Sequence, residues 1–266
     1  MDLDNKQTII PLLQKYDLFA RKRFGQNFLV NEDSLQAIVK TAEISPSDTI
    51  IEVGPGLGVL TVELAKKAKE VITIELDRNL LPVLAETLKD FNNIELLNQD
   101  ALKYVAEVSP YKIVANIPYN ITSHLINHFL QAENKPTSLT LLVQKEVAEK
   151  MSVLNPDMTV LSLQVALFGK MRYVKKIPAG HFHPAPKVDS AIIHIRLFTE
   201  KDPEYLPQET AMEILKIAKA CFSGRRKKLR NTLPSEYHEQ AAKVGLDLSL
   251  RPETLSVKQW RTLVEI

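Results

Sequence analysis

Three polar side chains that can bind a ligand lie directly after, or within three residues of, apolar runs of the sequence. They are Glu75, Asp100 and Asn116, behind the runs 71–74, 94–97 and 112–115. A carboxylate such as Glu75 can accept hydrogen bonds from both hydroxyl groups of a ribose, and Asp100 can accept one from the amino group of an adenine. Together the two acids predict a site for an adenosine-type ligand. Taken alone, Asp100 would more simply be an N-cap.

Asn116 opens the sequence Asn116-Ile117-Pro118-Tyr119. The Asn116 side-chain oxygen and a main-chain carbonyl of the same turn can accept both N–H bonds of an exocyclic amine on a nucleobase, while Tyr119 stacks on the ring. Pro118 fixes φ and removes one donor, which stiffens the turn so that its carbonyls keep their direction. Accepting both N–H bonds draws the nitrogen lone pair out of conjugation with the ring, so the amine becomes a nucleophile without a general base. A turn with a purely structural role would explain Pro118, but it would not explain why Asn116 and Tyr119 flank it.

The sequence Glu52-Val53-Gly54-Pro55-Gly56-Leu57-Gly58 follows a β-branched run and precedes a helical pattern. Glycine is needed where the backbone turns tightly or lies against a ligand without a Cβ in the way. The dinucleotide-binding pattern is G-x-G-x-x-G, whereas the spacing here is G-x-G-x-G. This contracted spacing, with Glu75 about 20 residues on, favours an adenosine ligand other than NAD. A turn with a purely structural purpose remains the alternative.

These residues need elements that bring them together, and the hydrophobic pattern predicts an α/β fold. Apolar strand-like runs alternate with helical patterns, which implies a parallel sheet that binds ligands beyond the carboxyl ends of its strands. The expected strands are 49–53, 71–74, 94–97, 112–115, 139–143, 172–177 and 191–197. The expected helices between the strands are 59–68, 79–89 and 159–168, and two further helices, a short amphipathic one at 8–17 and one at 31–42, precede the first strand.

The length of 266 residues suits one sizeable domain and a small second one. We expect the α/β domain at residues 1–198 and a small all-helical domain at residues 199–266, which opens with the polar, proline-containing stretch 199–207. Helices are expected there at 209–221, 236–244 and 257–263. A hydrophobic fraction of 45% with 25% charged residues is an ordinary globular balance.

The composition also bounds the compartment and the chemistry. The single cysteine, Cys221, excludes an internal disulfide and suits a reducing cytoplasm. We expect Cys221 to be a small, buried, structural side chain. No run approaches the roughly 20 apolar residues of a membrane span, and the first residues lack a signal-peptide core. The six histidines show no HExxH spacing, so no metal site is expected. We therefore expect a cytoplasmic protein without membrane contact.

Clusters of cations mark two candidate surfaces for nucleic acid, although the net charge is only +2. The first is Arg21-Lys22-Arg23, ahead of aromatic residues interleaved with glycine and amides, where Asn27 and the backbone near Leu29 can reach the ligand. The second places five cations in six positions, which repel one another unless phosphate is near; they are Arg225, Arg226, Lys227, Lys228 and Arg230. The alternative for the first cluster is a solvated linker, and the alternative for the second is a solvated face of a helix.

The motifs in their order resemble the rRNA adenine dimethyltransferase family. The segments that match are GQNFL, EVGPGLG, IELD, QDA, NIPY and FHPAPKVDS, with order and spacing preserved from about residue 24 to 195. The C-terminal segments 222–231 and 251–255 resemble the bacterial small-subunit (16S) branch rather than the resistance methylases. Residues 151–160 depart from the family pattern, because they lack its glycine-rich turn with Tyr-Gly.

The resemblance implies a Rossmann-like class I methyltransferase domain that uses S-adenosylmethionine. The acceptors would be two adjacent adenosines near the 3′ end of 16S rRNA in the immature small ribosomal subunit, each methylated twice at N6. The family's donor-binding positions fall on Asn27, Leu29, Gly54, Gly56, Glu75, Asp100 and Asn116. Phe182 would form a sandwich with Tyr119 around the flipped adenine. The basic C-terminal helices would dock on the subunit, and the enzyme would act as a monomer.

Other classes of function remain open. A non-catalytic ribosome assembly factor or RNA-binding module could use the same fold, although the intact Glu75, Asp100 and Asn116 argue against it. An NAD-linked oxidoreductase is disfavoured by the glycine spacing and by the turn after Asn116. A zinc deaminase would need H-x-E and P-C-x-x-C, and the sequence has neither.

Overall fold

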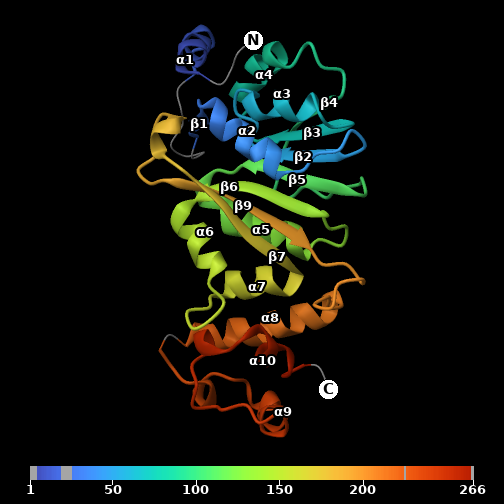
Figure 1. Cartoon of the computed structure of the whole chain (residues 1–266), viewed down its shortest axis with the longest axis vertical. Helices are drawn as coiled ribbons and strands as arrows, with labels where there is room; N and C mark the ends of the chain where they lie inside the picture. Colours follow the sequence, from blue (N-terminus) through green and yellow to red (C-terminus); the bar gives the residue numbers. More distant parts are fainter. Residues whose placement is uncertain (1–4, 19–25, 225, 265–266) are drawn as a thin grey trace. The chain divides into compact units, whose positions relative to one another are not determined.

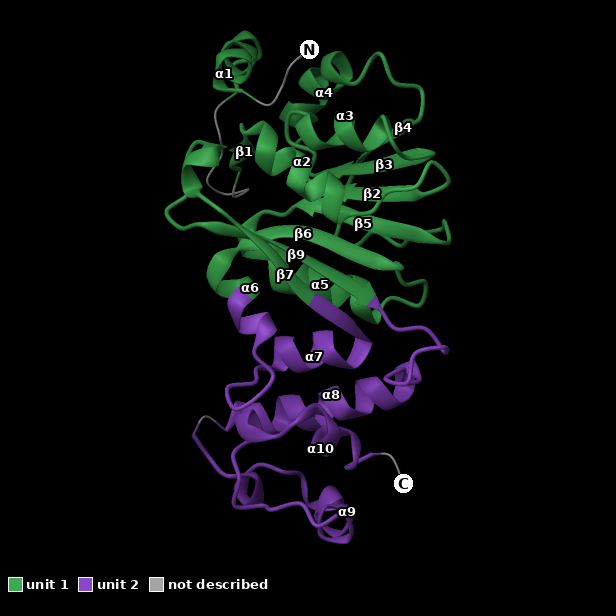
Figure 2. Cartoon of the chain, viewed as in Figure 1, with its two compact units in different colours: residues 1–148, 172–196 green, residues 149–171, 197–266 purple. Residues whose placement is uncertain are grey.

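The computed structural model of the chain describes residues 5–18, 26–224 and 226–264 (Figure 1). These residues divide into two compact units, 1–148 with 172–196 and 149–171 with 197–266 (Figure 2). The second unit thus includes the segment 149–171, which the sequence places in the first domain. The domain boundary at residue 198 stays a prediction.

The centre of the first unit is a seven-stranded sheet with the strand order β4-β3-β2-β5-β6-β9-β7. The strands are β2 (Thr49–Val53), β3 (Glu70–Glu75), β4 (Ile94–Asn98), β5 (Tyr111–Asn116), β6 (Ser138–Gln144), β7 (Gly169–Ile177) and β9 (Ser190–Leu197). The strands from β4 to β6 pair in parallel, as the sequence pattern predicts, whereas β9 pairs antiparallel with β6. The expectation of a parallel sheet is therefore wrong for β9. The connection from β7 to β9 contains a short 3-10 helix and a two-residue strand and no crossover α-helix.

The helices α1 and α2 of the first unit begin at side chains that cap them. Asn31 accepts a hydrogen bond from the backbone of Ser34 at the start of α2, and Asn5 does the same for Thr8 in α1. Pro82 stands in the first turn of α4, where a missing N–H costs nothing. The helices are α1 (Lys6–Lys15), α2 (Glu32–Thr41), α3 (Val59–Ala65), η2 (Arg78–Leu80), α4 (Leu81–Thr87), η3 (Tyr119–Ile121), α5 (Thr122–Gln131), α6 (Lys145–Ser152) and η4 (Ala179–His181).

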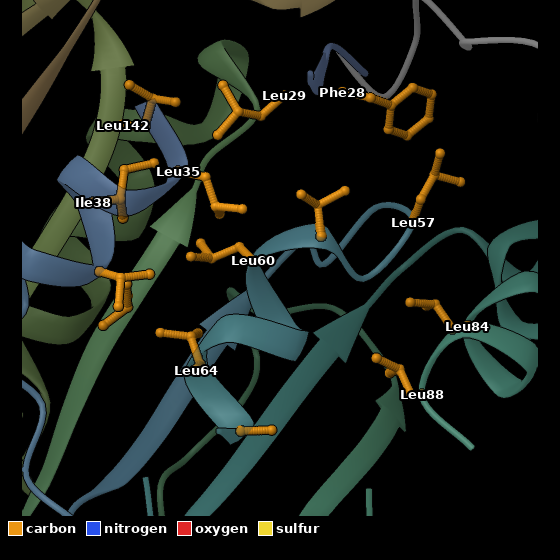
Figure 3. Packing of buried hydrophobic residues seen from close by; sticks show 14 of the residues in the cluster. Phe28, Leu29, Leu35, Ile38, Leu57, Leu60, Leu64, Leu84, Leu88 and Leu142 are labelled. Atoms are coloured by element: carbon orange, nitrogen blue, oxygen red, sulfur yellow. The ribbon is translucent and has the colours of Figure 1, made fainter. Parts of the chain in front are cut away.

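The central strands β2, β3, β5 and β6 are buried over most of their length on both faces, which fits strands that read as continuous apolar runs, whereas β4 and β7 at the two edges are partly exposed. All five residues of β2 are buried, and side chains alternate between the two faces along a strand. On one face, Ile50 belongs to a cluster that includes the leucines of α2, α3 and α4. Figure 3 shows Leu35 and Ile38 of α2 beside Leu60 and Leu64 of α3. Burying each such side chain contributes about 1.5–3 kcal/mol.

A second, very small sheet pairs β1 (Phe28–Leu29) antiparallel with β8 (Phe182–His183). Two residues per strand are too few for a periodic signal, so the sequence pattern did not predict it. The pairing sets Leu29 opposite Phe182 and joins two segments that are about 150 residues apart. This pairing holds residues 28 and 29 against residues 182 and 183 within the first unit.

In the described residues of the second unit, the regular structure is helical except for the first residues of β7 and the last residue of β9. Its helices are α7 (Val160–Phe168), α8 (Gln208–Ser223), η5 (Leu229–Asn231), η6 (Ser235–Tyr237), α9 (His238–Lys243), η7 (Pro252–Thr254) and α10 (Val257–Arg261), together with the end of α6. Trp260 is fully buried and its ring stacks on Phe222 with the centroids 6.0 Å apart. Across the described residues of both units, no helix has the length and apolar character needed to span a membrane.

Candidate active site

A cavity of about 280 Å³ opens at the carboxyl ends of the parallel strands and is bounded by the segment after Gln26. Ligands of open α/β sheets bind at this edge because successive strands and their loops converge there. Nine of the residues predicted from the sequence line this one cavity: Asn27, Leu29, Gly54, Gly56, Glu75, Asp100, Asn116, Pro118 and Tyr119. The two acids and the acceptor amide therefore face the same space.

The glycine turn between β2 and α3 has the backbone conformation that glycine allows. Gly54 and Gly56 have φ values of +71° and +61°, in the left-handed region that strains other residues. A Cβ on Gly56 would also lie 3.2 Å from a ring carbon of Phe28. The turn is closed by hydrogen bonds from the Gly54 N–H to the Ile74 carbonyl at 3.0 Å and from the Gly58 N–H to the Pro55 carbonyl at 2.9 Å. The backbone of this glycine turn and the Phe28 side chain together form one wall of the cavity.

Glu75 ends β3 and is only 7% exposed. Its Oε1 accepts a hydrogen bond from the Asp77 N–H at 2.7 Å. Removal from water raises the pKa of the Glu75 carboxyl to about 7, and the hydrogen bonds from nearby backbone N–H groups offset only part of this effect. A ligand that donates two hydroxyl hydrogen bonds would stabilise the ionised form.

Glu52 is a second buried acid of the cavity, and the sequence reasoning missed it. It lies on β2 and is 1% exposed, and its Oε2 accepts a hydrogen bond from the Thr73 hydroxyl of the neighbouring strand at 3.2 Å. Burial raises the pKa of the Glu52 carboxyl to about 7, and the charge of Glu75 adds to the rise. The signal that would have found it is a lone acid within the apolar strand Thr49–Val53.

Asp100 lies in the loop after β4 and shapes that loop as well as lining the cavity. Its Oδ1 accepts a hydrogen bond from the Leu102 N–H at 3.0 Å, and its carbonyl accepts one from the Lys103 N–H at 2.9 Å. The residues that follow form a turn rather than a helix, so the alternative role of Asp100 is that of a turn residue. The carboxylate keeps capacity for a further donor, because it can accept about four hydrogen bonds.

Asn116 is the last residue of β5, and its side chain is oriented by a hydrogen bond to another residue of the cavity lining. The Nδ2 group donates to the main-chain carbonyl of Asn27 at 3.3 Å, which leaves the Oδ1 atom as an acceptor. Tyr119 follows in η3, is half-buried, and its hydroxyl lies 2.6 Å from the hydroxyl of Ser190 on β9. An acceptor oxygen and an aromatic ring thus lie in one turn, as the sequence predicts.

Phe182 does not reach the cavity in this structure. Its side chain is 1% exposed, it belongs to the same apolar cluster as Phe28 and Leu29, and it is absent from the cavity lining. Phe182 is therefore not part of the lining of this cavity, and its place opposite Tyr119 at a flipped adenine stays a prediction. The pairing of β8 with β1 explains this placement, because it draws the Phe182 backbone to Leu29.

The predicted basic residues that the structure describes are not among the residues that line the cavity. Arg226, Lys227, Lys228 and Arg230 are exposed around the buried Leu229, in the loop between α8 and η5 and at η5 itself. Arg21, Lys22, Arg23 and Arg225 lie outside the described residues. Among the residues that the structure describes, no group of three or more His, Cys, Asp or Glu side chains could hold a metal ion.

The fold and the cavity define the class: this is a Rossmann-like class I methyltransferase with a helical C-terminal part. Two solved structures have the same fold over most of the chain. The 23S rRNA methyltransferase ErmE has a TM-score of 0.73 at 30% identity, covering 90% of this chain and 98% of that one. A dimethyladenosine transferase from Plasmodium falciparum has a TM-score of 0.75 at 26% identity, covering 89% and 95%.

Residues 18–266 match the family described as ribosomal RNA adenine dimethylase, and the chain belongs to this family. Two proteins named ribosomal RNA small subunit methyltransferase A are among its relatives. The one from Dehalococcoides mccartyi (strain CBDB1) is 40% identical over 270 residues, covering 95% of this chain and 90% of that protein. The one from Clostridioides difficile (strain 630) is 36% identical over 272 residues, covering 96% and 93%. The family expected from the motifs, and with it an enzyme that methylates rRNA adenine, is confirmed.

Proposed function

We propose that this protein dimethylates two adjacent adenosines near the 3′ end of 16S rRNA at N6, with S-adenosylmethionine as methyl donor. The observation that carries the proposal is that Glu75, Asp100 and Asn116 line a single cavity at the carboxyl edge of the sheet. The small-subunit rRNA is favoured by the names of the relatives that match nearly the whole chain.

The residues present fit such a donor. Glu75 would accept the ribose hydroxyl groups, Asp100 would accept from the adenine amino group, and the glycine turn lets the backbone lie close to the ligand. The donor supplies an electrophilic methyl group on a positively charged sulfur. The buried acids Glu52 and Glu75 favour a positively charged ligand in this cavity when they are ionised.

On the acceptor side, the chain positions an amine rather than removing a proton from it. The Asn116 Oδ1 atom and a main-chain carbonyl of the turn would accept the two N–H bonds of adenine N6, while the Tyr119 ring holds the base by stacking. Acceptor oxygens and an aromatic face also stabilise the positive charge that develops on the nitrogen. The proton can leave to water afterwards.

The exposed cations of the second unit would hold the RNA through its phosphates. Arg226, Lys227, Lys228 and Arg230 present four positive charges around Leu229. Binding of phosphate by such a cluster releases counterions and depends steeply on salt. We infer that the enzyme acts as a cytoplasmic monomer on the immature small subunit and that this cluster docks on it.

The test is methyl transfer from radiolabelled S-adenosylmethionine to small subunits purified from a strain that lacks this protein, followed by mapping of the modified nucleotides. We expect N6,N6-dimethyladenosine at two adjacent positions near the 3′ end of 16S rRNA. Subunits from a strain that has the protein should accept little label, because their sites are already filled. Binding to the subunits without transfer would instead identify an assembly factor, and label elsewhere in the RNA would overturn the assigned substrate.

A further inference from the structure

A series of hydrogen bonds connects the acid on the donor side of the cavity with the amide on the acceptor side. The Asp77 N–H donates to Glu75 Oε1 at 2.7 Å, and the Gln26 Nε2 group donates to Asp77 Oδ2 at 3.1 Å. Gln26 is followed in the chain by Asn27, whose carbonyl accepts from the Asn116 Nδ2 group at 3.3 Å. Two of the links join segments that are distant in the sequence, because Gln26 and Asp77 are 51 residues apart and Asn27 and Asn116 are 89 residues apart.

The segment 26–29 that forms the middle of this series borders the cavity. Its C-terminal end is held by the pairing of β1 with β8, and the Val30 N–H donates to the His181 carbonyl at 2.8 Å. The Phe28 ring lies against Gly56, and Figure 3 shows it near Leu57 of the same turn. At its N-terminal end, the Gln26 side chain reaches η2 through Asp77.

Asp77 is well suited to hold that end in one place. It is 3% exposed, and its Oδ1 atom accepts hydrogen bonds from both the backbone and the side chain of Asn79, at 3.2 and 2.5 Å. These bonds fix the carboxylate so that Oδ2 points to Gln26. Hydrogen bonds to an ionised acceptor are stronger and more directional than those between neutral groups.

We propose that Gln26 and Asp77 are positioning residues for the methyl transfer, because their hydrogen bond holds the segment 26–29 over the cavity and keeps the Asn27 carbonyl in the bond that orients Asn116. This role rests on the proposed function. Neither residue accepts or donates a group in the reaction. Loss of the bond removes one of the contacts that hold the N-terminal end of the segment, so the Asn27 carbonyl moves more freely and orients the Asn116 amide less well.

The variants Gln26→Ala, Asp77→Ala and the double variant test this role in two separate measurements. In the ligand-free protein, amide hydrogen exchange of residues 28–30 should be about tenfold faster in each variant, and no faster still in the double variant. In methyl transfer, kcat should fall about tenfold with a smaller change in the KM for the RNA. Gln26→Lys supplies another N–H donor to Asp77 and should restore both values to near those of the wild type.

A matched control comes from α2, where the Gln36 Nε2 group donates to the Glu63 carboxylate at 3.2 Å on the surface. Gln36→Ala removes a bond of the same type outside the cavity and should change neither measurement. Unchanged exchange in Gln26→Ala would overturn the proposal, as would additive effects in the double variant. The exchange measurement needs neither donor nor RNA. A wild-type protein that transfers no methyl group would thus refute the proposed function. The hydrogen-exchange measurement would still decide whether Gln26 holds the segment 26–29.

Discussion

The hydroxyl groups of Tyr119 and Ser190 lie 2.6 Å apart and tie the acceptor turn to β9. This hydrogen bond holds the Tyr119 ring in place through its hydroxyl group. Tyr119→Phe should keep the stacking face and lose less than about tenfold in kcat/KM, whereas Tyr119→Ala should lose about 10- to 100-fold, because base stacking contributes about 1–3 kcal/mol. Steady-state kinetics on small subunits measure both. Equal losses in the two variants would assign the hydroxyl, rather than the ring, to the reaction.

Asn116→Ala should abolish turnover and leave the fold intact, because it removes the acceptor oxygen that directs the amine. The far-ultraviolet circular dichroism spectrum and the melting temperature should stay close to those of the wild type. Asn127→Ala, which changes an amide of α5 outside the cavity lining, serves as control. Methyl transfer by Asn116→Ala within about tenfold of the wild type, a barrier change near 1.4 kcal/mol, would contradict the assigned role.

Donor affinity should rise with pH between about 6 and 8. Burial raises the pKa of Glu75 to about 7, and the ionised carboxylate accepts from the two ribose hydroxyl groups more strongly than the protonated form, in which one oxygen carries a proton. Below that pKa the ligand must displace a proton, so the affinity should fall by about tenfold per pH unit. Calorimetric titration with S-adenosylmethionine at several pH values measures this. Glu75→Gln should bind more weakly at pH 8 and lose most of this pH dependence, and a flat wild-type profile would argue against the ribose assignment.

Glu52 should make the fold less stable as the pH rises. Its pKa is raised from 4.5 to about 7 by burial, so between these values the folded state binds a proton that the unfolded state has lost. The free energy of unfolding should therefore fall on going from pH 5 to pH 8, by up to about 3 kcal/mol from this group. Glu52→Gln removes the titrating group and keeps an acceptor for Thr73.

The comparison that isolates Glu52 is urea unfolding of wild type and variant at pH 5 and pH 8. Glu52→Gln should match the wild type at pH 5 and be more stable than it at pH 8. Glu95→Gln, which replaces an exposed acid on β4, should show no such difference. A variant less stable than the wild type at pH 8 would indicate that the ionised Glu52 carboxylate stabilises the fold.

Phe182 should behave as a core residue. Phe182→Ala should lower the free energy of unfolding by about 3–5 kcal/mol, as expected when a buried aromatic side chain is removed. Phe182→Leu keeps most of the apolar volume and should leave kcat within a few-fold of the wild type. A loss of about 100-fold in kcat in a folded Phe182→Leu protein would show instead that the ring reaches the adenine during the reaction.

Much of the fold could be predicted because the strands are short, apolar and regularly spaced. The bounds of β2 agree with the prediction, and α2 begins at the capping residue Asn31 as expected. The strands β1 and β8 have only two residues each, too few for a periodic signal in the sequence. The hydrophobic pattern also does not show the direction of a strand, so the antiparallel pairing of β9 with β6 could not be predicted. The grouping of 149–171 with the C-terminal unit depends on packing between α7 and α8, which a pattern along one segment does not contain.

The sequence by itself determined which chemical groups are present and where the strands end, because acid, acid and amide follow successive apolar runs at Glu75, Asp100 and Asn116. Only the tertiary structure decided which groups share an environment. Burial inside the sheet raises the pKa of Glu52, the pairing of β1 with β8 buries Phe182, and the position of Asp77 holds Gln26 near the cavity. These properties depend on removal from water and on distances across the fold, and neither is a property of the residues taken one at a time.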